Sequence, residues 1–570
     1  MKPLLFFILI SYNTFSYSQI TFPQNYFSSP LDIRLIVSGT FGELRRDHFH
    51  SGVDFATQSK INANVYCIAD GYVSRIKVSP AGYGKVIYVT HPNGFVSVYA
   101  HLNEFNVVVE DYVRLKQYEK KSYDIELFPN PELFKFHKGE IIGYSGNTGS
   151  SSGPHLHFEI RNEKTERPIN PFLFGYKIPD NLSPEINAVY FYPKSANSEI
   201  NNSTNRTVLN VIKKGSGQYL KSNDTATVSG GIAFGILASD PQINVGSSGI
   251  YSMEISIDNH LFYKISFDSV DFDESRYINT LIDYPEYVAN KKEIMQTYMS
   301  YGNRLNIYKV SENRGIYYFN DTLLHIIKFT VSDFSNNATS LEIPVKSIIQ
   351  TNKKNSTPES NLPLFRFGLK NHFENKNIIL DLPSDALYDS IYFEYSSEPD
   401  TKGLFSAIHK VHNKYTPLHT PAILKIKPDC LIKELLLSKL TLAYISDQSL
   451  SFVKSTWDNG FLSAGINKFG DYAIVADTNA PIIKAIRNYN NTQIYSGEII
   501  SFKINDDFSG IETYNLTING CWVLAEYDAK NELLSYKVDK SHFIKGPNSL
   551  ELVVTDKLNN KNVYSATLLN

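Results

Sequence analysis

The chain has 570 residues, which is too long for one hydrophobic core and predicts about three to four domains. Its formal charge of -3 and pI near 6.5 do not indicate binding to nucleic acid or to an anionic membrane surface. A hydrophobic content of 42% with 20% charged residues excludes a disordered chain, and 38 Tyr and 35 Phe against 4 Met favour β-structure.

The first eighteen residues are typical of a secretory signal. Lys2 gives a positive start, residues 4–10 form a short apolar run, and Ser16 and Ser18 suit signal peptidase cleavage before Gln19. The run is far shorter than the roughly 20 residues that a membrane span needs. We therefore expect an exported protein of the periplasm or cell envelope that does not span the membrane, with a buried N-terminal strand as the alternative for this run.

Residues 27–178 are predicted to form one domain. Short runs of β-forming residues alternate with Gly, Pro and Asn turns, and helical periodicity is nearly absent. This pattern indicates a compact antiparallel β-sheet, sandwich or barrel-like fold. The charged and aromatic stretch 111–138 interrupts the domain and is expected to be an inserted hairpin or lobe, either a surface elaboration or a substrate contact.

Three further β-domains are predicted at residues 184–349, 362–477 and 480–570, so the expected class is all-β throughout. Polar segments around residues 178–184 and 351–361 read as linkers. One segment, residues 286–298, is predicted to be either a short helix or an irregular insert. The carboxyl-terminal domains offer no cluster of catalytic residues, so we expect them to position the chain or bind protein partners.

The second and last of these units share sequence features. Asp506-Asp-Phe-Ser-Gly-Ile511 is similar to the segment from Asp240 to Ile250, where Ser-Gly-Ile also precedes a strand. Both units end in a Val-Ser-Asp or Val-Thr-Asp turn followed by paired Asn. We interpret them as two copies of an immunoglobulin-like sandwich.

The three cysteines, Cys67, Cys430 and Cys521, fall in three different predicted domains. An odd number at such separations is no disulfide framework. Cys67 lies in an apolar run and is expected to act as a small core residue.

Two separated histidine motifs carry the residues from which a catalytic metal site is made. His50-Ser-Gly-Val-Asp54 places an imidazole and a carboxylate four residues apart, and Gly52 between them is expected to let the backbone turn. His155-Leu-His157 places two imidazoles on one face of a strand. A catalytic zinc site takes three such ligands from protein and leaves a fourth position for water. Together with His101, these motifs indicate metal-assisted hydrolysis.

The pattern resembles the lysostaphin-like (LytM-type) zinc metallopeptidases, which cut peptide cross-links in bacterial cell walls. The resemblance covers residues 40–175, about a quarter of the chain. The segments that carry it are Phe49-His-Ser-Gly-Val-Asp-Phe-Ala56, Ala69-Asp-Gly-Tyr-Val73, Gly82-Tyr-Gly-Lys-Val86, Tyr99-Ala-His-Leu102, Lys138-Gly-Glu-Ile-Ile-Gly143, the run Gly146–Glu159 and Asn170-Pro171. The chain departs from the family pattern in the 111–138 insert, in Cys67 and in its long β-rich second half.

Carried over position by position, the resemblance implies that His50, Asp54 and His157 hold one zinc ion per chain. It implies that His101 and His155 are the catalytic histidines, one taking a proton from water and the other stabilising the oxyanion or protonating the leaving amine. The sequence leaves open which histidine does which.

Other polar residues near these motifs have simpler readings. His48 forms a second His-X-His with His50, but Gly52 four residues later cannot be a ligand. His91 and His137 are expected at the surface. Arg45 and Arg46 are expected in a solvated loop, with binding of a substrate carboxylate as the alternative.

The resemblance implies an exported zinc endopeptidase acting on peptidoglycan stem peptides, by default at a D-Ala–diaminopimelate bridge. The alternatives are a non-enzymatic wall-binding scaffold or activator of other wall hydrolases, and a protease for other proteins. Relatives that become activators lose ligands, whereas all five site residues are present here.

Overall fold

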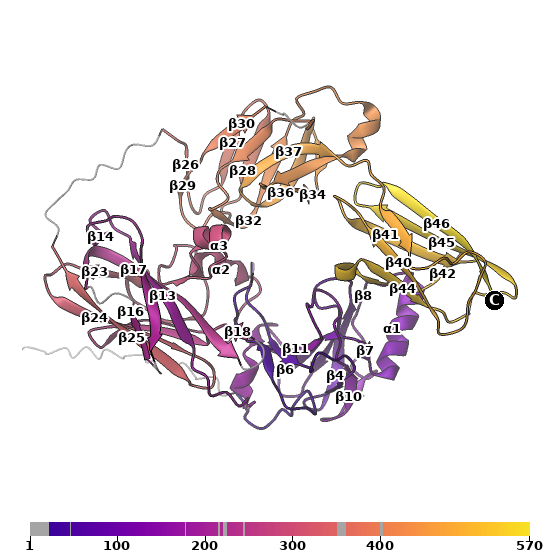
Figure 1. Ribbon diagram of the computed structural model, residues 1–570, viewed down its shortest axis with the longest axis horizontal. Helices are drawn as coiled ribbons and strands as arrows, with labels where there is room; N and C mark the ends of the chain where they lie inside the picture. Colours follow the sequence, from indigo (N-terminus) through magenta and orange to yellow (C-terminus); the bar gives the residue numbers. More distant parts are fainter. Residues whose placement is uncertain are drawn as a thin grey trace, which may run out of the picture.

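The computed structural model describes residues 22–45, 47–176, 178–214, 217–220, 225–242, 246–349, 361–399, 403–447 and 449–570. Four β-rich bodies follow one another along the chain and close into a ring (Figure 1). We call them the N-terminal domain (residues 22–176), the second domain (178–349), the third domain (361–477) and the C-terminal domain (478–570). The expected all-β class is confirmed. The predicted signal at residues 1–18 and most of the second linker lie outside the described residues.

The N-terminal domain is built on one large antiparallel sheet. Its strands lie in the order β1 (Val37–Gly39), β2 (Val53–Ala56), β11 (His155–Asn162), β6 (Phe95–Leu102), β5 (Lys85–Thr90), β4 (Gly71–Val78) and β8 (Ile125–Leu127), with β12 (Pro168–Ile169) beside β11 and β9 (Lys135–Phe136) beside β4. A small sheet of β3 (Asn64–Tyr66), β10 (Ile141–Tyr144) and β7 (Glu104–Phe105) packs near it, and a 3-10 turn (Pro171–Phe174) ends the domain.

Strand β11 has two buried faces of opposite character. Leu156, Phe158 and Ile160 point into the hydrophobic core. Because side chains alternate along a strand, the intervening His155, His157 and Glu159 share the other face. The sequence of β11 thus alternates apolar and functional residues.

The 111–138 insert, predicted to be a hairpin or lobe, contains most of a helix followed by two short strands. Helix α1 (Val107–Lys120) begins at Asn106, whose side chain accepts a hydrogen bond from the Val108 amide, and it ends at Lys121 in the left-handed conformation. Its strands β8 and β9 then return to the edge of the main sheet.

The second domain is organised around the long strand β17 (Ala226–Gln242). The strands follow the order β16 (Gly217–Leu220), β15 (Thr207–Lys214), β13 (Glu185–Pro193), β17, β25 (Ala338–Ser347), β24 (Leu324–Ser332), β19 (Ser252–Ile257), β20 (His260–Ser266) and β22 (Tyr308–Ser311). Strand β17 also pairs with β14 (Glu199–Ile200), β18 (Gly246–Ser248), β21 (Met295–Gln296) and β23 (Ile316–Phe319). Short helices α2 (Ile278–Leu281) and α3 (Tyr284–Asn290) lie between β20 and β21, so the segment 286–298 is part helix and part strand.

The third domain packs two antiparallel sheets around one hydrophobic core. One sheet has the order β27 (Asn371–Glu374), β28 (Ile378–Leu382), β32 (Pro417–Ile426), β36 (Phe461–Lys468) and β35 (Thr456–Asp458). The other has the order β30 (Tyr395–Glu398), β31 (Ile408–Val411), β37 (Gly470–Ala476), β33 (Leu440–Ile445) and β34 (Leu450–Val453), and β26 (Leu364–Phe365) pairs with β29 (Ile391–Tyr392).

The C-terminal domain is also two sheets around a shared core, which is the arrangement of a β-sandwich. One sheet has the order β38 (Ile482–Ala485), β40 (Ile499–Asn505), β44 (Leu533–Lys537) and β43 (Glu526–Asp528). The other has the order β39 (Thr492–Gln493), β46 (Lys561–Leu569), β45 (Pro547–Asp556), β41 (Ile511–Ile518) and β42 (Cys521–Trp522).

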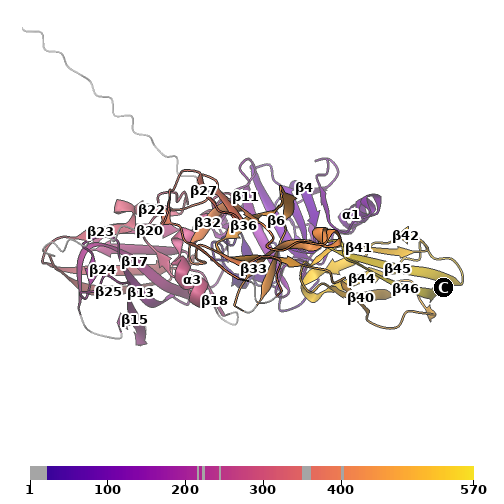
Figure 2. The same cartoon turned by 90° about the horizontal axis from the view of Figure 1, so that it is seen from above.

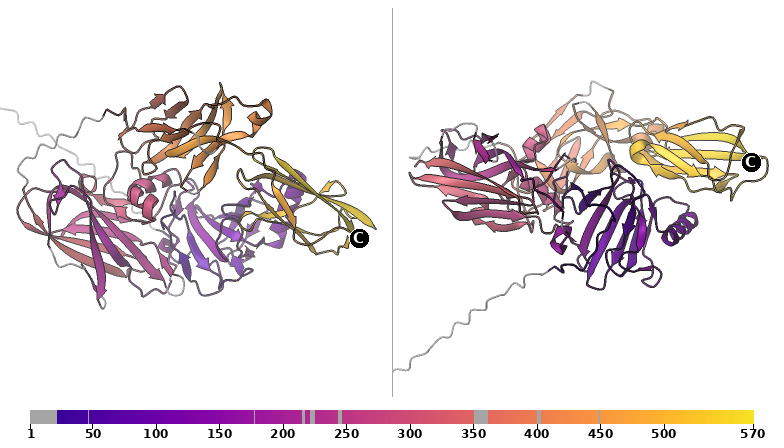
Figure 3. Two further views of the ribbon diagram at one scale, coloured as in Figure 1. Left: turned by 45° about the horizontal axis from the view of Figure 1, so that its top comes forward. Right: turned by 60° about the horizontal axis from the view of Figure 1, so that its bottom comes forward.

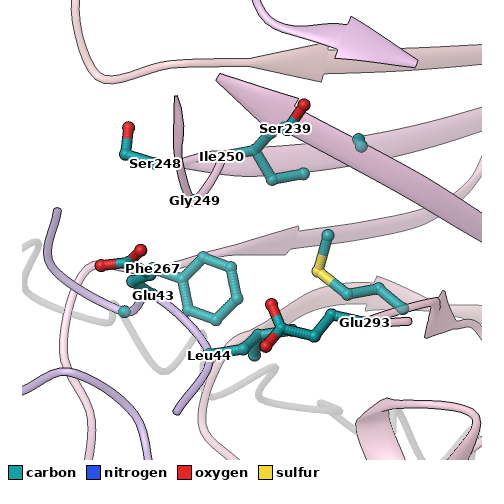
Figure 4. Close-up of a pocket in the computed structure, with 11 residues that line it drawn as sticks. Glu43, Leu44, Ser239, Ser248, Gly249, Ile250, Phe267 and Glu293 are labelled. Atoms are coloured by element: carbon teal, nitrogen blue, oxygen red, sulfur yellow. The ribbon is translucent and has the colours of Figure 1, made fainter. Parts of the chain in front are cut away.

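Contacts between successive domains hold the ring together. The N-terminal and second domains share one hydrophobic core, and Arg167 pairs with Asp271 at 2.8 Å across their junction. A cavity of about 160 Å³ lies at this junction between Glu43 and Glu293 (Figure 4), and burial raises the pKa of both carboxyls. In the next junction, the ring of Tyr277 stacks on His419 at 4.2 Å.

The C-terminal domain returns to the N-terminal domain and closes the ring along α1 (Figures 1 and 3). The Tyr118 hydroxyl donates a hydrogen bond to Asp539 at 2.9 Å, and its ring meets Trp522 edge-on at 5.3 Å. Viewed from above, the domains lie in one elongated layer (Figure 2). Within the described residues, no helix is both long and apolar enough to cross a membrane.

Candidate metal centre

Three adjacent strands bring the site residues together. His157 on β11 lies directly opposite Asp54 on β2 and opposite Ala100 on β6. His50 lies three residues before the start of β2, and His101 follows Ala100. Residues separated by a hundred positions in the chain therefore meet because β11 inserts between β2 and β6.

His50, Asp54 and His157 form a tight triangle of facing atoms. His50 Nε2 lies 3.1 Å from both Asp54 Oδ1 and His157 Nδ1, and His157 Nδ1 lies 2.9 Å from Asp54 Oδ1. All three side chains are largely buried. The structure thus converges two imidazole nitrogens and one carboxylate oxygen on a single point.

The outer nitrogens of both imidazoles are committed to acceptors. His50 Nδ1 donates a hydrogen bond to the Thr40 carbonyl at 2.7 Å, and His157 Nε2 donates to Glu159 Oε1 at 2.8 Å. When both rings are neutral, the inward nitrogens therefore carry lone pairs. Two facing lone pairs beside a carboxylate require a cation or an added proton between them.

His155 and His101 complete the site on its other side. His155 Nε2 lies 3.5 Å from Asp54 Oδ1, and the rings of His101 and His155 are 4.9 Å apart. His155 Nδ1 donates to the Gly153 carbonyl and His101 Nδ1 to the Thr148 carbonyl, each at 2.8 Å. In the neutral rings each Nε2 thus has a lone pair that can accept a proton.

His101 reaches the site through an unusual backbone conformation. Because Ala100 lies opposite His157, strict alternation along β6 would send His101 to the other face of the sheet. His101 instead has a φ of 58°, in the left-handed region that non-glycine residues seldom adopt. Such backbone strain is often concentrated at functional sites.

A buried carboxylate behind His157 holds the site in place. Glu159 is fully buried, and its Oε1 accepts hydrogen bonds from Ser51 at 2.8 Å and Tyr83 at 2.5 Å as well as from His157. Its Oε2 pairs with the buried Arg161 at 2.6 Å. Sequence reasoning assigned no role to Glu159, although its position two residues after His157 on one strand could have indicated it.

The electrostatics of the site are dominated by burial and by the carboxylates. Burial opposes ionisation of Asp54, but the charge of His50 and hydrogen bonds from three histidines hold the pKa of Asp54 well below its usual range. Burial likewise opposes charging of His157, but hydrogen bonds to Asp54 and Glu159 raise its pKa to about 9. Burial and the neighbouring histidines lower the pKa of His101 to about 3, so that its ring is neutral at physiological pH.

This donor set fits zinc. The separations of 2.9–3.1 Å among the three facing atoms are close to the roughly 3.3 Å edge of a tetrahedron with zinc bonds of about 2.0–2.1 Å. The raised pKa of His157 reflects a preference for positive charge between Asp54 and Glu159, which a metal ion satisfies equally well. The Glu159–His157 pair is also the outer hydrogen bond that metal-bound histidines typically make.

Gly52 is needed because the structure leaves no room for a side chain at this position, not because the backbone turns there. A Cβ at Gly52 would lie 2.5 Å from the Phe158 carbonyl oxygen and 2.9 Å from His157 Cε1. Gly52 does not have a positive φ. We expected the conformational freedom of glycine to let the backbone turn here. The structure instead shows that the chain at Gly52 passes close to β11.

The remaining candidates fall outside the cluster. His48 and His137 are exposed. His91 was expected at the surface but is buried. Its ring makes hydrogen bonds through Nδ1 with the Asp70 carbonyl at 2.9 Å and through Nε2 with Ser97 Oγ at 2.7 Å. Arg45 pairs with Glu43 at 2.9 Å and lies 3.6 Å from Asp54 Oδ2, and Arg46 lies outside the described residues.

Comparison with known proteins locates this site in a familiar domain. Residues 48–118 and 135–171 match the model of peptidase family M23, and residues 363–477 match that of a Zu5-like domain. The unmatched residues 119–134 fall within the segment that contains the end of α1 and β8.

Three curated relatives align with the same part of the chain. DD-carboxypeptidase/endopeptidase Mpg of Neisseria meningitidis serogroup B is 32% identical over 131 residues, 23% of this chain and 24% of the relative. Peptidoglycan DD-endopeptidase ShyA of Vibrio cholerae is 30% identical over 137 residues, 23% of this chain and 26% of the relative. Lysostaphin of Staphylococcus simulans is 32% identical over 130 residues, 22% of this chain and 21% of the relative.

The chain thus spans about a quarter of the length of these relatives. The similarity lies in the part of the chain that holds His50, Asp54, His101, His155 and His157. The residues around the candidate metal centre therefore make up a peptidase family M23 domain.

Proposed function

We propose that this chain is an exported, zinc-dependent endopeptidase that hydrolyses peptide cross-links of bacterial peptidoglycan. The observation that carries the proposal is the convergence of His50 Nε2, Asp54 Oδ1 and His157 Nδ1 on one point, with the outer N–H of both imidazoles already committed. The printed names of two relatives, a peptidoglycan DD-endopeptidase and a DD-carboxypeptidase/endopeptidase, support a wall peptide as the substrate. Export rests on the signal-like sequence before Gln19.

His50, Asp54 and His157 would hold the zinc ion. The chemistry that zinc supplies there is that of a Lewis acid, which polarises a carbonyl group and makes water a stronger nucleophile near neutral pH. Glu159 keeps the Nδ1 lone pair of His157 directed inward, because it fixes the proton on Nε2.

His101 and His155 would handle the proton and the developing charge. Each ring is fixed by a hydrogen bond from Nδ1 to a backbone carbonyl, which leaves Nε2 available, and His155 Nε2 lies 3.5 Å from Asp54 Oδ1. A neutral Nε2 can take the proton of the attacking water, and a protonated one can donate a hydrogen bond to the oxyanion or protonate the leaving amine. Because the two rings lie 4.9 Å apart, they can serve opposite sides of one scissile bond.

The test is a muropeptide digest with the purified, zinc-loaded protein. We expect loss of cross-linked dimers with wild type and no loss with His157→Ala or His101→Ala. His48→Ala is the matched control, since His48 is exposed beside the site, and it should digest like wild type. Unchanged muropeptide profiles with wild-type protein that retains one zinc would contradict the enzymatic proposal and favour a wall-binding scaffold or activator.

The scissile bond is tested in the same assay. We expect cleavage of a D-Ala–diaminopimelate cross-link in preference to a glycine-rich peptide. Faster cleavage of the glycine peptide would replace the proposed bond, and cleavage of an unrelated unfolded protein alone would indicate a general protease.

A further inference from the structure

Two junctions in the ring contain the same arrangement of three aspartates. Asp180, Asp240 and Asp333 form one trio, at the start of the second domain, and Asp477, Asp506 and Asp556 form the other, where the third domain meets the C-terminal domain. In each trio, every residue offers one carboxylate oxygen, and the three oxygens lie within 4.8 Å of one another. Two members of each trio, Asp240 with Asp333 and Asp506 with Asp556, lie in the repeated sequence motifs, which the catalytic site does not use.

The first and third aspartates of each trio are joined through an asparagine in the same way. In the C-terminal domain, Asn560 Nδ2 donates to Asp556 Oδ2 at 2.7 Å and to the Asp477 carbonyl at 3.0 Å. In the second domain, Asn337 Nδ2 donates to Asp333 Oδ2 at 2.7 Å and to the Asp180 carbonyl at 3.2 Å. The arrangement is therefore built twice, at equivalent places in two domains.

The carboxylates are buried, which is unfavourable for like charges. Asp477 is 3% exposed and Asp556 is fully buried, and Asp506 between them is half-buried. Among the described residues, no Lys, Arg or His nitrogen is within ion-pair distance of Asp477, Asp506 or Asp556. Three close carboxylates in a low-dielectric environment repel one another unless a positive charge joins them.

Two oxygens of this trio also lack a hydrogen-bond partner. Asp477 Oδ2 and Asp506 Oδ1 are buried atoms that accept no hydrogen bond from any described residue. Their sister oxygens are satisfied, because Asp477 Oδ1 accepts from the Asn479 amide and Asp506 Oδ2 from the Gly510 amide at 2.8 Å. Buried carboxylate oxygens that are left over after the backbone is satisfied suit a metal ligand.

We propose that each trio binds a calcium ion. The donors are all oxygens, with no imidazole or thiolate in either trio, and hard divalent cations prefer such ligands while zinc prefers nitrogen and sulfur. Calcium accepts irregular sets of carboxylate and carbonyl oxygens, whereas magnesium demands near-octahedral geometry. The sites are separate from the candidate zinc centre and do not depend on the proposed peptidase activity.

Each site would fasten the segment that enters its domain. Asp180 lies between the 3-10 turn that ends the N-terminal domain and β13, and Asp477 lies between β37 of the third domain and β38. Asp240 and Asp333 lie further along the second domain, and Asp506 and Asp556 lie in the C-terminal domain. Calcium would therefore stiffen two of the junctions that set the shape of the ring.

Isothermal titration of the full-length protein with CaCl₂, after dialysis into calcium-free buffer, tests the proposal. We expect two sites per chain, with dissociation constants of about 10⁻⁴–10⁻³ M, as in extracellular modules. Asp506→Asn should remove one site, Asp240→Asn the other, and the double variant both. Asp507→Asn and Asp273→Asn are matched controls with exposed carboxylates, and both should keep two sites.

Thermal unfolding separates a calcium site from a purely structural role. CaCl₂ should raise a wild-type transition, and Asp506→Asn should abolish this rise without lowering the transition in calcium-free buffer, because one repelling charge is gone. A folded wild type that binds no calcium at millimolar concentration overturns the proposal. So does binding that survives in the double variant, or a response to MgCl₂ alone.

Discussion

Each of the four histidines around Asp54 has one ring nitrogen committed to an acceptor. Three donate to backbone carbonyls, of Thr40, Thr148 and Gly153, and His157 alone donates to a carboxylate, Glu159. A backbone carbonyl fixes a tautomer, but a buried carboxylate also makes the imidazole a stronger ligand. Glu159 is thus the residue outside the cluster with the most direct influence on it.

Replacing Glu159 with Gln should reduce activity without removing a ligand. Gln keeps the volume of the side chain but loses its charge, so His157 becomes a weaker ligand and the buried Arg161 loses its ion pair. We expect a loss of about 10–100-fold in kcat/KM or in zinc affinity. Zinc content and kcat/KM measured in parallel check this, with the exposed Glu166→Gln as control. Wild-type values for Glu159→Gln would show that the hydrogen bond to His157 is dispensable.

The three cysteines should differ sharply in reactivity. Cys67 is fully buried and its thiol donates to the Ala69 carbonyl, and burial raises its pKa to about 12. Cys430 and Cys521 are exposed. Because a thiol with a raised pKa stays protonated, Cys67 should be unreactive at pH 8.

A thiol-specific reagent should therefore react with two cysteine thiols in the native protein at pH 8 and with three after denaturation. In Cys430→Ser/Cys521→Ser, the native count should fall to zero. Rapid labelling of the remaining thiol in that variant would mean that the core around Cys67 opens readily.

At the level of elements, the strands of the site followed from local patterns but their order did not. The alternation in His155-Leu-His-Phe-Glu-Ile160 predicts a strand with one functional face, and the structure has that strand. The insertion of β11 between β2 and β6 is a long-range pairing with no local signal. The left-handed backbone at His101 is also set by the packing around it.

Helix α1 escaped prediction because its sequence resembles a strand. Val107-Val-Val109 has high β-propensity, and two of these valines remain exposed in the helix. The buried stripe consists only of Val109, Val113 and Gln117, four residues apart, which is too narrow for a strong helical pattern. Its capping by Asn106 and its packing against the core decide the outcome.

The close approach of β2 and β11 should make Gly52 intolerant of substitution. In Gly52→Ala, the new Cβ would meet the Phe158 carbonyl at 2.5 Å, so the two strands that carry Asp54 and His157 must separate. Overpacking of this kind costs about 1–3 kcal/mol. Calorimetric unfolding and zinc content check the loss, with Gly153→Ala as control because nothing lies within 4 Å of its Cβ position. Equal losses in both variants would contradict the steric explanation.

On the scale of the whole molecule, the ring brings the C-terminal domain to the edge of the site. Lys530, in the last 3-10 turn (Ala529–Asn531), donates to the Ser151 carbonyl at 2.9 Å and also to the Asn147 carbonyl. Both carbonyls belong to the loop that also contains Thr148 and Gly153. The Thr148 carbonyl orients the ring of His101, and the Gly153 carbonyl orients the ring of His155. Lys530 and Ser151 are 379 residues apart in the sequence, and their hydrogen bond supports the loop that positions the two histidines.

Point substitution is a better test of this support than truncation. The N-terminal and second domains share one hydrophobic core, so a fragment ending near residue 180 would expose apolar surface that the full chain buries. Changing Lys530 leaves that core intact.

Lys530→Ala should lower kcat while leaving zinc content unchanged. Without its two hydrogen bonds, the loop from Asn147 to Ser151 gains freedom, and His101 and His155 spend less time in the geometry that proton transfer requires. We expect a several-fold drop in kcat on muropeptide dimers, with little change in the unfolding temperature because the lysine is exposed. Lys561→Ala, an exposed lysine on β46, is the matched control and should behave like wild type. A rise in kcat would instead mean that the C-terminal domain restrains the enzyme, and an unchanged kcat would show that the loop holds its shape unaided.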